Sequence, residues 1–363
     1  MKRYLLLLLA CLTTSMSDAQ QLSYSLDTLF EHQVSAEKPG IALLIWQSGK
    51  ILYQKAKGKA RLEGGEPLTP RTTFRMASVS KQFTAMGILL LEKEGKLKLE
   101  EPLSTFFPEF NKTVASKVTL KHLLTHTSGI ADYEALMGTG WDRQILDEDV
   151  LKLVGTQNQT YFTPGTRFRY SNSGFCILAM VVQKVSGMPY AAFMREKLFI
   201  PLGMRRTYLY DEKHRPPGNA MGYSRDTTGA IIDSDQSLTS ATRGDGCVYT
   251  CLEDYLVWHQ ALQQGKPLDI MKKLQEIHFK FPELPESGYG LGWFYSEANP
   301  TELFHSGTTC GFSNVVVRVP DKNLLIAYFS NLADNHELFQ QVLNAMKGGA
   351  PTLQWQKLHK LTN

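Results

Sequence analysis

The chain has 363 residues, of which 43% are hydrophobic and 20% are charged, and its formal net charge at pH 7 is +4. This apolar content is enough for a large core and excludes a disordered chain. The basic residues are scattered and their excess is small, so nucleic acid is not an expected partner.

The first residues follow the order of a secretory signal. Lys2 and Arg3 precede a leucine-rich run, and small and polar residues follow up to Ala19. We therefore expect residues 1–19 to be a signal peptide and the protein to be exported, either periplasmic or secreted. The apolar run is too short to be a permanent transmembrane segment. Leu8-Leu9-Ala10-Cys11 resembles a bacterial lipoprotein cleavage box, and a lipid anchor at Cys11 is the alternative.

Two elements are predicted in the next part of the chain. Residues 40–60 contain two β-rich runs around Gln47-Ser48-Gly49-Lys50, which indicates a hairpin. The stretch MASVSKQFTAMGILLLEKEGK, residues 76–96, has apolar side chains at helical spacing and a glycine near its end. It is therefore predicted to be a helix that starts at Ser78.

The rest of the chain first favours helices and then strands. Residues 103–284 alternate short helical patterns with long turn-rich connections, and the clearest helices are 173–186, 190–198 and 252–264. Strand character returns after residue 287, in the runs 290–295, 313–319 and 324–329. A final helix is expected at 335–346, followed by a frayed tail at 347–363.

This order predicts an α+β fold. A lone hairpin and three distant strands both need partners, so the two ends of the chain are expected to form one antiparallel sheet, flanked by helices. The expected single domain covers residues 20–346, with a sheet subdomain (about 22–75 plus 286–346) and an inserted, mostly helical subdomain (about 76–285). A cleft between the two would lie next to Ser78.

Ser78 and Lys81 are the first candidates for chemistry. A spacing of three residues puts them on one face of a helical turn, where free backbone N–H groups favour negative charge and an amine can help to take the serine proton. The pattern alone is not decisive, because Ser35 and Lys38 have the same spacing and run directly into Pro39. A solvated serine and lysine at a helix start are the alternative.

Two further segments carry candidate residues. Residues 163–174 favour turns and offer a phenol at Tyr170 and an amide at Asn172, which could equally be a packed aromatic and a helix cap. Residues 304–308 contain His305, Gly307 and Thr308, and the glycine permits close approach of another backbone or a substrate.

His122 and His126 have the spacing of two metal ligands on a helix. They lack the glutamate and the third ligand of a zinc protease, so we interpret them as structural and expect no metal and no cofactor.

Four cysteines follow Cys11. Cys176 lies in an apolar run and is expected to be a buried small side chain. A disulfide between Cys310 and either Cys247 or Cys251 is compatible with an oxidising compartment, but the spacing of these cysteines does not establish one.

In chain order the three segments read Ser-x-x-Lys, Tyr-x-Asn and His-x-Gly. The chain thus resembles the serine β-lactamase and penicillin-binding protein superfamily, whose signature is S-x-x-K, S-D-N and K-T-G. It is most similar to the branch that holds class C β-lactamases, D-alanyl-D-alanine carboxypeptidases, D-aminopeptidases and serine esterases. Family-like segments also occur at residues 123–130, 201–204 and 289–293, so the resemblance covers roughly residues 25–345.

The resemblance implies an exported serine hydrolase with the β-lactamase/transpeptidase-like fold. Ser78 would form an acyl-enzyme on a peptide or ester carbonyl, and Lys81 and Tyr170 would handle its proton, with the choice of general base left open. Asn172 would hold the substrate amide and the lysine. The expected activity is of the D-alanyl carboxypeptidase or carboxylesterase type.

The third motif would complete substrate binding through His305, Gly307 and Thr308, with the backbone N–H groups of Ser78 and Thr308 as the oxyanion hole. His305 stands where relatives usually have lysine. Because an ordinary histidine is largely neutral at pH 7, anionic substrates are expected to react weakly, and more so as the pH rises. A class C-like β-lactamase and a non-catalytic penicillin- or muropeptide-binding sensor are the alternatives.

Overall fold

The computed structural model describes residues 18–210, 217–297 and 301–346. The predicted lipidation site at Cys11 and the predicted tail at 347–363 lie outside the described residues. So does nearly all of the predicted signal peptide, except Asp18 and Ala19, which begin helix α1 (Asp18–Gln33). No helix was expected in this region from the sequence.

One eight-stranded antiparallel sheet organises the structure, with the strand order β2-β1-β13-β12-β11-β10-β9-β8. Its first two strands come from the start of the chain and the other six from the end, so the predicted α+β arrangement is confirmed. The strands are β1 (Ile41–Gln47), β2 (Lys50–Lys57), β8 (Phe279–Phe281), β9 (Leu284–Gly290), β10 (Trp293–Ser296), β11 (Glu302–Thr309), β12 (Phe312–Val319) and β13 (Leu324–Ser330).

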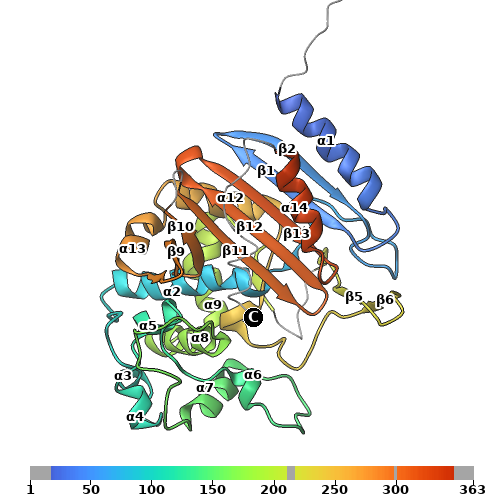
Figure 1. Ribbon diagram of the computed structural model, residues 1–363. Coiled ribbons are helices and arrows are strands. Elements are labelled where there is room, and N and C mark those ends of the chain that lie inside the picture. The colour runs from blue at the N-terminus through green and yellow to red at the C-terminus, as the bar shows by residue number, and fades with distance from the viewer. Residues whose placement is uncertain (1–17, 211–216, 298–300, 347–363) are drawn as a thin grey trace, which may run out of the picture.

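The sheet separates two apolar layers, and helices lie on both of its faces (Figure 1). Because successive side chains of a strand point to opposite faces, Leu43 of β1 packs with Phe30 of α1 and Phe339 of α14 (His336–Ala345). Its neighbour Leu44 belongs to the core on the other face, where α12 (Leu252–Gln263) contacts β1 and β13. Both faces of β1 are covered, which explains its nearly continuous apolar sequence.

Two hairpins of this sheet, β1–β2 and β9–β10, differ in how well the sequence predicts them. Ser48 and Gly49, with φ of 47° and 90°, form the expected turn between β1 and β2. The run 290–295 was expected to be a single strand, and that expectation is wrong: Leu291 and Gly292 form a turn between β9 and β10, with φ of 55° and 80°. Leucine rarely adopts a positive φ, so no local pattern indicates this turn.

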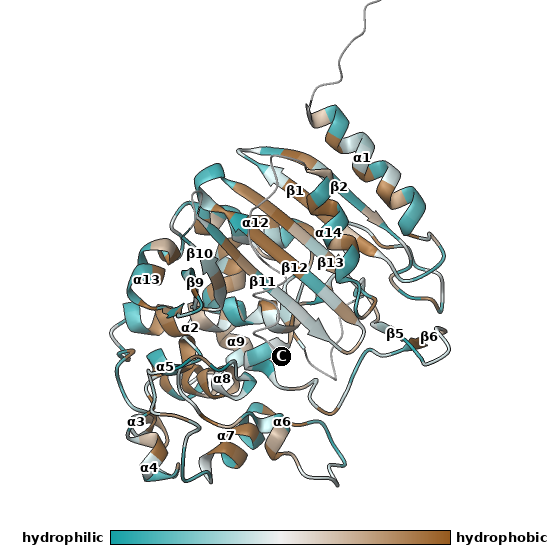
Figure 2. Ribbon diagram, in the orientation of Figure 1, coloured by the Kyte–Doolittle hydropathy of each residue, from teal (hydrophilic) through white to brown (hydrophobic). Residues whose placement is uncertain are grey.

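The inserted part of the chain is mostly helical. Its helices are η1 (Ala77–Ser80), α2 (Lys81–Lys93), α3 (Leu103–Phe106), α4 (Lys112–Ala115), α5 (Leu120–Leu124), α6 (Tyr133–Leu136), α7 (Asp147–Gly155), α8 (Asn172–Ser186), α9 (Tyr190–Met194), the π-helix η2 (Arg195–Phe199), α10 (Ile200–Leu202), α11 (Arg243–Gly246), α12 and α13 (Ile270–Glu276). Helix α8 is largely apolar and central (Figure 2), and it packs against α2, α7 and α11.

Smaller elements complete the fold. Strands β3 (Phe74–Arg75), β7 (Val248–Thr250) and β4 (Tyr208–Leu209) form a three-stranded sheet, β5 (Tyr223–Arg225) pairs with β6 (Ile231–Asp233), and η3 (Pro320–Lys322) joins β12 to β13. None of the described helices is by itself long and apolar enough to cross a membrane. Helix α8 and the segment Tyr190–Leu202 have the necessary length and apolarity only when counted together, and they meet at an 80° bend.

The four cysteines of the described chain are free thiols. Cys176 is fully buried, as expected, and Cys247 and Cys251 are fully buried as well. Cys310 is partly exposed in the turn between β11 and β12, with its sulfur 3.6 Å from Ser240 Oγ. The disulfide that the sequence left open is therefore not formed in this structure.

Candidate active site

Ser78 lies in a tightly fixed turn between the two parts of the molecule. Strand β3 leads into η1, and Ala77, directly before Ser78, has a φ of 49°, a strained conformation for a residue with a Cβ. The Met76 N–H donates to the Val248 carbonyl (2.8 Å), and the Val248 N–H donates to Ser80 Oγ (3.0 Å). These bonds from β7 hold the Ser78 hydroxyl partly exposed at a helix start.

Lys81 begins α2 and is fully buried. Its ammonium group donates to three oxygens: Ser78 Oγ at 3.0 Å, Asn172 Oδ1 at 2.8 Å and the Asp245 carbonyl at 3.0 Å. An ammonium group has three donors, so each has an acceptor and the nitrogen is fixed beside the serine. The structure thus brings together Ser78, Lys81 and Asn172, three of the residues that the sequence predicted.

Tyr170 lies beside this lysine. Its ring centroid is 4.9 Å from Lys81 Nζ and 4.2 Å from the centroid of the His126 ring. The phenol oxygen is buried, yet among the described residues it has no hydrogen-bond partner of ordinary geometry. A buried hydroxyl without a partner is costly in a fold, and one beside a candidate nucleophile is available to a reacting group.

The lysine and the phenol influence each other's ionisation. Burial raises the pKa of Tyr170, while the charge of the nearby Lys81 ammonium opposes that rise. Burial by itself lowers the pKa of Lys81, but Tyr170 and the Asp245 carboxylate outweigh it, so the lysine pKa is raised. The resting pair at neutral pH is therefore an ammonium and a neutral phenol, and the two titrate as a unit.

Asn172 connects the lysine to the helical side of the cleft. It is the first residue of α8, and its backbone N–H donates to Asp132 Oδ2 at 2.6 Å. Its side-chain Nδ2 donates to Glu134 Oε1 over a long 3.5 Å, which leaves this amide nitrogen weakly held. Much of Glu134 is open to solvent, yet burial of its carboxyl group raises its pKa. A titratable acid group therefore lies beside the amide that is expected to hold substrate.

Strand β11 forms the other wall. It contacts η1, and a Cβ at Gly307 would lie 2.1 Å from the Met76 carbonyl oxygen, so only glycine permits this approach. Thr308, the next residue, is exposed. The Asn314 side chain of β12 donates to the Arg75 carbonyl at 2.8 Å, which ties the sheet to the segment before Ser78. Gly307 and Thr308 thus lie on a strand that packs against the turn of the candidate nucleophile.

His305 differs from the expectation of an accessible substrate-binding side chain, because it is fully buried. Its Nδ1 lies 2.6 Å from the Ser306 carbonyl, and its Nε2 lies 3.2 Å from the Tyr289 hydroxyl. These partners assign the ring proton to Nδ1, with Tyr289 donating to Nε2. The imidazole therefore packs behind Tyr170, at a ring-centroid distance of 6.3 Å, and its contact with substrate remains a prediction.

The two histidines with metal-like spacing have partners within the protein. His122 Nδ1 accepts from the Thr119 N–H (3.2 Å) in a capping box, and His126 Nδ1 accepts from the Ser171 N–H (3.2 Å). Within residues 18–210, 217–297 and 301–346, no group of three or more His, Cys, Asp or Glu side chains is placed to hold a metal ion.

Three contributors were missed by the sequence reasoning. Asp245 acts through its backbone carbonyl, which no side-chain pattern reveals. Glu134 is separated from Asn172 by 38 positions and gives no local signal. The His126 ring packs at a tilt against Tyr170, and its Nδ1 accepts a hydrogen bond from the N–H of Ser171; the sequence drew attention to His126 only through its spacing from His122 and interpreted it as structural, without a link to Tyr170.

Comparisons with known proteins identify the family and the fold of the chain. The Beta-lactamase family model matches residues 26–347. A penicillin-binding protein of Bacillus subtilis (strain 168) is 31% identical over 340 residues, which cover 88% of this chain and 74% of that protein.

Two solved structures have the same fold at lower sequence identity. A D-amino acid amidase from Ochrobactrum anthropi SV3, complexed with L-phenylalanine amide, is 24% identical with a TM-score of 0.75, covering 91% of this chain and 99% of that one. EstCE1, described as a hydrolase with promiscuous acyltransferase activity, is 21% identical with a TM-score of 0.76, covering 91% of this chain and 99% of its own. The chain therefore belongs to the Beta-lactamase family, the β-lactamase-fold serine hydrolases that include the penicillin-binding proteins.

Proposed function

We propose that the protein is an exported serine hydrolase that forms an acyl-enzyme on Ser78 and hydrolyses a peptide or ester carbonyl. The observation that carries this proposal is the Lys81 ammonium, 3.0 Å from Ser78 Oγ and 2.8 Å from Asn172 Oδ1, with the unpartnered Tyr170 hydroxyl beside it. A buried lysine that merely supported the fold would need neither a partly exposed serine as acceptor nor an unsatisfied phenol as neighbour.

The chemistry follows from which groups hold protons. In the resting state Lys81 donates to Ser78 Oγ, so it has no free electron pair for the serine proton. The Lys81–Tyr170 pair becomes reactive when it has lost one proton. Either the neutral amine or the phenolate then accepts the proton of the Ser78 hydroxyl as Oγ bonds to the substrate carbonyl carbon. One electron pair of the substrate C=O bond moves onto the carbonyl oxygen, and this oxygen accepts hydrogen bonds from the backbone N–H groups of Ser78 and Thr308.

Collapse of this intermediate releases the amine or alcohol, which takes up the proton that the pair received. Water then attacks the ester carbonyl of the acyl-enzyme and gives a proton to the same pair. The bond to Ser78 Oγ breaks, the serine takes that proton, and the carboxylic acid product leaves. Every proton is returned, so no metal or cofactor is needed for the balance.

The charges around Asn172 support a neutral or cationic acyl part of the substrate. Glu134 supplies a carboxylate 3.5 Å from Asn172 Nδ2, and His305, where relatives usually have lysine, is buried with its nitrogens directed at protein groups. A carboxylate near Glu134 would meet a like charge, and at position 305 a buried imidazole replaces the lysine cation of relatives. This supports an esterase or a peptidase for uncharged groups over an efficient β-lactamase.

Incubation with a penicillin, followed over time by intact-mass spectrometry, separates the candidate activities. A covalent adduct that is released slowly, together with turnover of a D-alanyl peptide or a neutral ester, supports the proposed function. Rapid release with β-lactam turnover would favour the class C-like β-lactamase. A permanent adduct without turnover of any substrate would favour the non-catalytic sensor.

Export is proposed from the sequence of residues 1–19 alone. Cell fractionation of the full chain and of a form that lacks residues 2–19 tests it. Only the full chain should reach the periplasm or the medium, and membrane retention that depends on Cys11 would favour the lipid anchor.

A further inference from the structure

Segment α11 (Arg243–Gly246) supplies the third acceptor of the catalytic lysine. Its Asp245 carbonyl lies 3.0 Å from Lys81 Nζ. The segment has only four residues and two of them are glycines, so its own helical hydrogen bonds hold it weakly. Its position must therefore be fixed by other parts of the chain.

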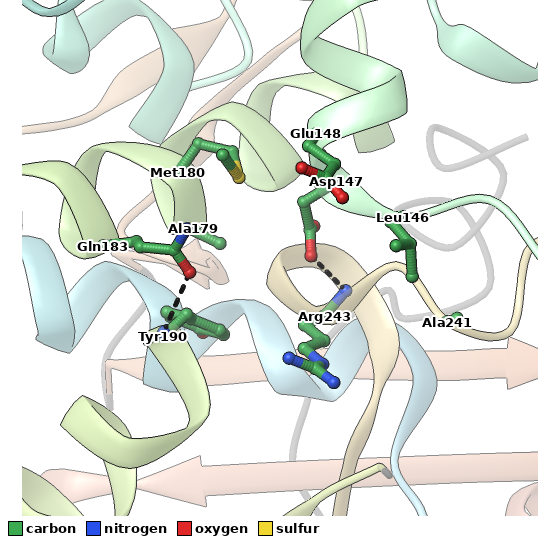
Figure 3. A pocket seen from close by; sticks show the side chains of 9 residues that line it. All are labelled: Leu146, Asp147, Glu148, Ala179, Met180, Gln183, Tyr190, Ala241 and Arg243. Atoms are coloured by element: carbon green, nitrogen blue, oxygen red, sulfur yellow. Dashed lines mark hydrogen bonds between the residues drawn. The ribbon is translucent and has the colours of Figure 1, made fainter. Parts of the chain in front are cut away.

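Asp147, the first residue of α7, provides that fixation from one side. Its Oδ2 accepts from the Arg243 N–H at 2.8 Å and its Oδ1 from the Gly244 N–H at 3.0 Å, so both oxygens bind the start of the segment. Figure 3 shows the carboxyl group directed at this backbone, within a pocket of about 140 Å³ that α7, α8 and α11 line together.

Thr84 holds the same segment from the other side. The Tyr190 hydroxyl donates to Thr84 Oγ1 at 2.6 Å, and Thr84 in turn donates to the Gly244 carbonyl at 2.6 Å. A Cβ at Gly244 would lie 2.1 Å from the Phe175 carbonyl oxygen, so the backbone is pressed against α8. Asp147 and Lys81 are thus connected through α11: Asp147 accepts from the N–H groups of Arg243 and Gly244, and the carbonyl of the next residue, Asp245, accepts from Lys81.

We propose that Asp147 is a positioning residue for the acyl transfer, whose carboxylate holds Arg243–Gly246 in the place where the Asp245 carbonyl fixes the Lys81 ammonium beside Ser78. This inference rests on the proposed function. It adds a residue 69 positions from the nucleophile in sequence that touches neither substrate nor the reacting atoms.

The carboxyl group can act in this way only when it is ionised. A carboxylate accepts both N–H bonds, whereas a carboxylic acid turns one oxygen into a donor that faces an N–H, so one of the two bonds is lost. Burial raises the pKa of Asp147 to about 7, and the two N–H bonds oppose that rise. The charged or titratable groups around it are Glu148, Cys176, Tyr190, Arg243, Asp245 and Cys247.

This ionisation sets how the reactivity of Ser78 changes with pH. Above pH 7 the carboxylate holds α11, and below it the protonated acid releases one bond and Lys81 is less well fixed, so the reactivity of Ser78 falls on the acid side. Asp147→Asn imitates the protonated state, since an amide offers one acceptor and one donor in the same shape.

The test measures the maximal rate of Ser78 labelling by a fluorophosphonate in the full-length protein between pH 5.5 and 8.5. Asp147→Asn should lower this rate about 10-fold at pH 8.5, with little change in the reagent concentration that gives half the maximal rate. The ratio of wild-type to variant rates should approach one at pH 5.5. The control Glu148→Gln changes the adjacent carboxylate of the same pocket and should match the wild type at every pH.

A wild-type rate for Asp147→Asn at pH 8.5, or a ratio that does not depend on pH, would overturn the proposal. If Asp147→Asn does not fold, Thr84→Val tests the same segment through the Gly244 carbonyl: a loss of about 5-fold supports the inference and an unchanged rate overturns it. Absence of Ser78-dependent labelling in the wild type would instead refute the proposed function.

Discussion

The ammonium nitrogen of Lys81 lies 3.0 Å from Ser78 Oγ, and both side chains leave consecutive turns of one helical segment. The spacing of three residues makes this contact possible, but the other two acceptors of the ammonium come from residues 91 and 164 positions away. The contact therefore depends on how the helical part closes around α2, and changes at several distant positions should alter it.

Tyr170→Phe should separate catalysis from stability. The phenyl ring keeps the packing against His126, and the lost hydroxyl has no hydrogen-bond partner among the described residues, so the free energy of unfolding should stay the same or rise by about 1 kcal/mol. Hydrolysis should fall about 100-fold or more, because the pair with Lys81 loses a proton acceptor.

The matched control for this change is Tyr289→Phe, which removes a hydroxyl that donates to His305. It should lower the free energy of unfolding by about 1 kcal/mol and affect turnover much less. Urea unfolding and ester hydrolysis, measured on both variants, check the pair. Equal losses of activity in the two variants would argue against a special role for the phenol of Tyr170.

Glu134→Gln should change the preference for substrate charge. With its pKa raised by burial, Glu134 is protonated in acid and becomes negative as the pH rises, so discrimination against a carboxylate-bearing amide should grow with pH. The variant should increase kcat/KM for that amide about 5-fold at pH 8.5 and leave a neutral ester unchanged.

Rates for the two substrates between pH 5.5 and 8.5 test this charge effect, with the exposed Glu109→Gln as the control. Identical pH profiles for both substrates in the wild type would contradict it. They would also contradict the expectation, drawn from histidine at position 305, that anionic substrates react more weakly as the pH rises.

Gly307→Ala should disturb the wall of the cleft. The added methyl group would lie 2.1 Å from the Met76 carbonyl oxygen, which is backbone and cannot rotate away, so β11 must move from η1. We expect a loss of about 1–3 kcal/mol in the free energy of unfolding and a fall in kcat, since Thr308 moves as well.

Gly138→Ala is the control for this substitution, because nothing lies within 4 Å of a Cβ at that position. It should leave both quantities unchanged. Thermal unfolding and steady-state kinetics measure the effects, and a fully stable and active Gly307→Ala would show that β11 does not need this close approach.

His126→Asn should change how stability depends on pH. Burial and the nearby Lys81 hold the pKa of His126 well below its ordinary value, so in mildly acidic solution the unfolded chain binds a proton that the folded protein does not. Stability should therefore rise with pH up to about 6.5, with a slope of up to about 1.4 kcal/mol per pH unit from this group.

The variant should reduce that slope between pH 5 and 7. Urea unfolding at several pH values provides the measurement. An unaltered slope in His126→Asn would mean that the buried imidazole is not neutral in the folded protein.

The fold was predictable wherever local patterns and global packing agree. The turn at Ser48 and Gly49 and the apolar strands around it have strong local signals, and both ends of the chain had unpaired strands that required one another. The turn at Leu291 was missed because tertiary packing imposes a positive φ on leucine, which no local preference indicates.

The candidate site shows the same division. Side chains that carry chemistry, such as Ser78, Lys81, Tyr170 and Asn172, were found from residue type and spacing. The Asp245 carbonyl was not, because a backbone oxygen has no residue-specific signal. The burial of His305 was not anticipated either: the resemblance implied a role in substrate binding, whereas in the structure the ring is buried and the Tyr289 hydroxyl lies 3.2 Å from its Nε2.

The most direct test of the account is intact-mass spectrometry after treatment with a fluorophosphonate at pH 8, on the wild type, Ser78→Ala and Lys81→Met, with Lys93→Met of the same helix as the control. We predict one stoichiometric adduct on the wild type and on Lys93→Met, none on Ser78→Ala, and labelling of Lys81→Met that is slower by about 100-fold or more. An adduct that persists in Ser78→Ala, or a Lys81→Met variant that is folded and labelled at the wild-type rate, would contradict the claim that Lys81 activates Ser78.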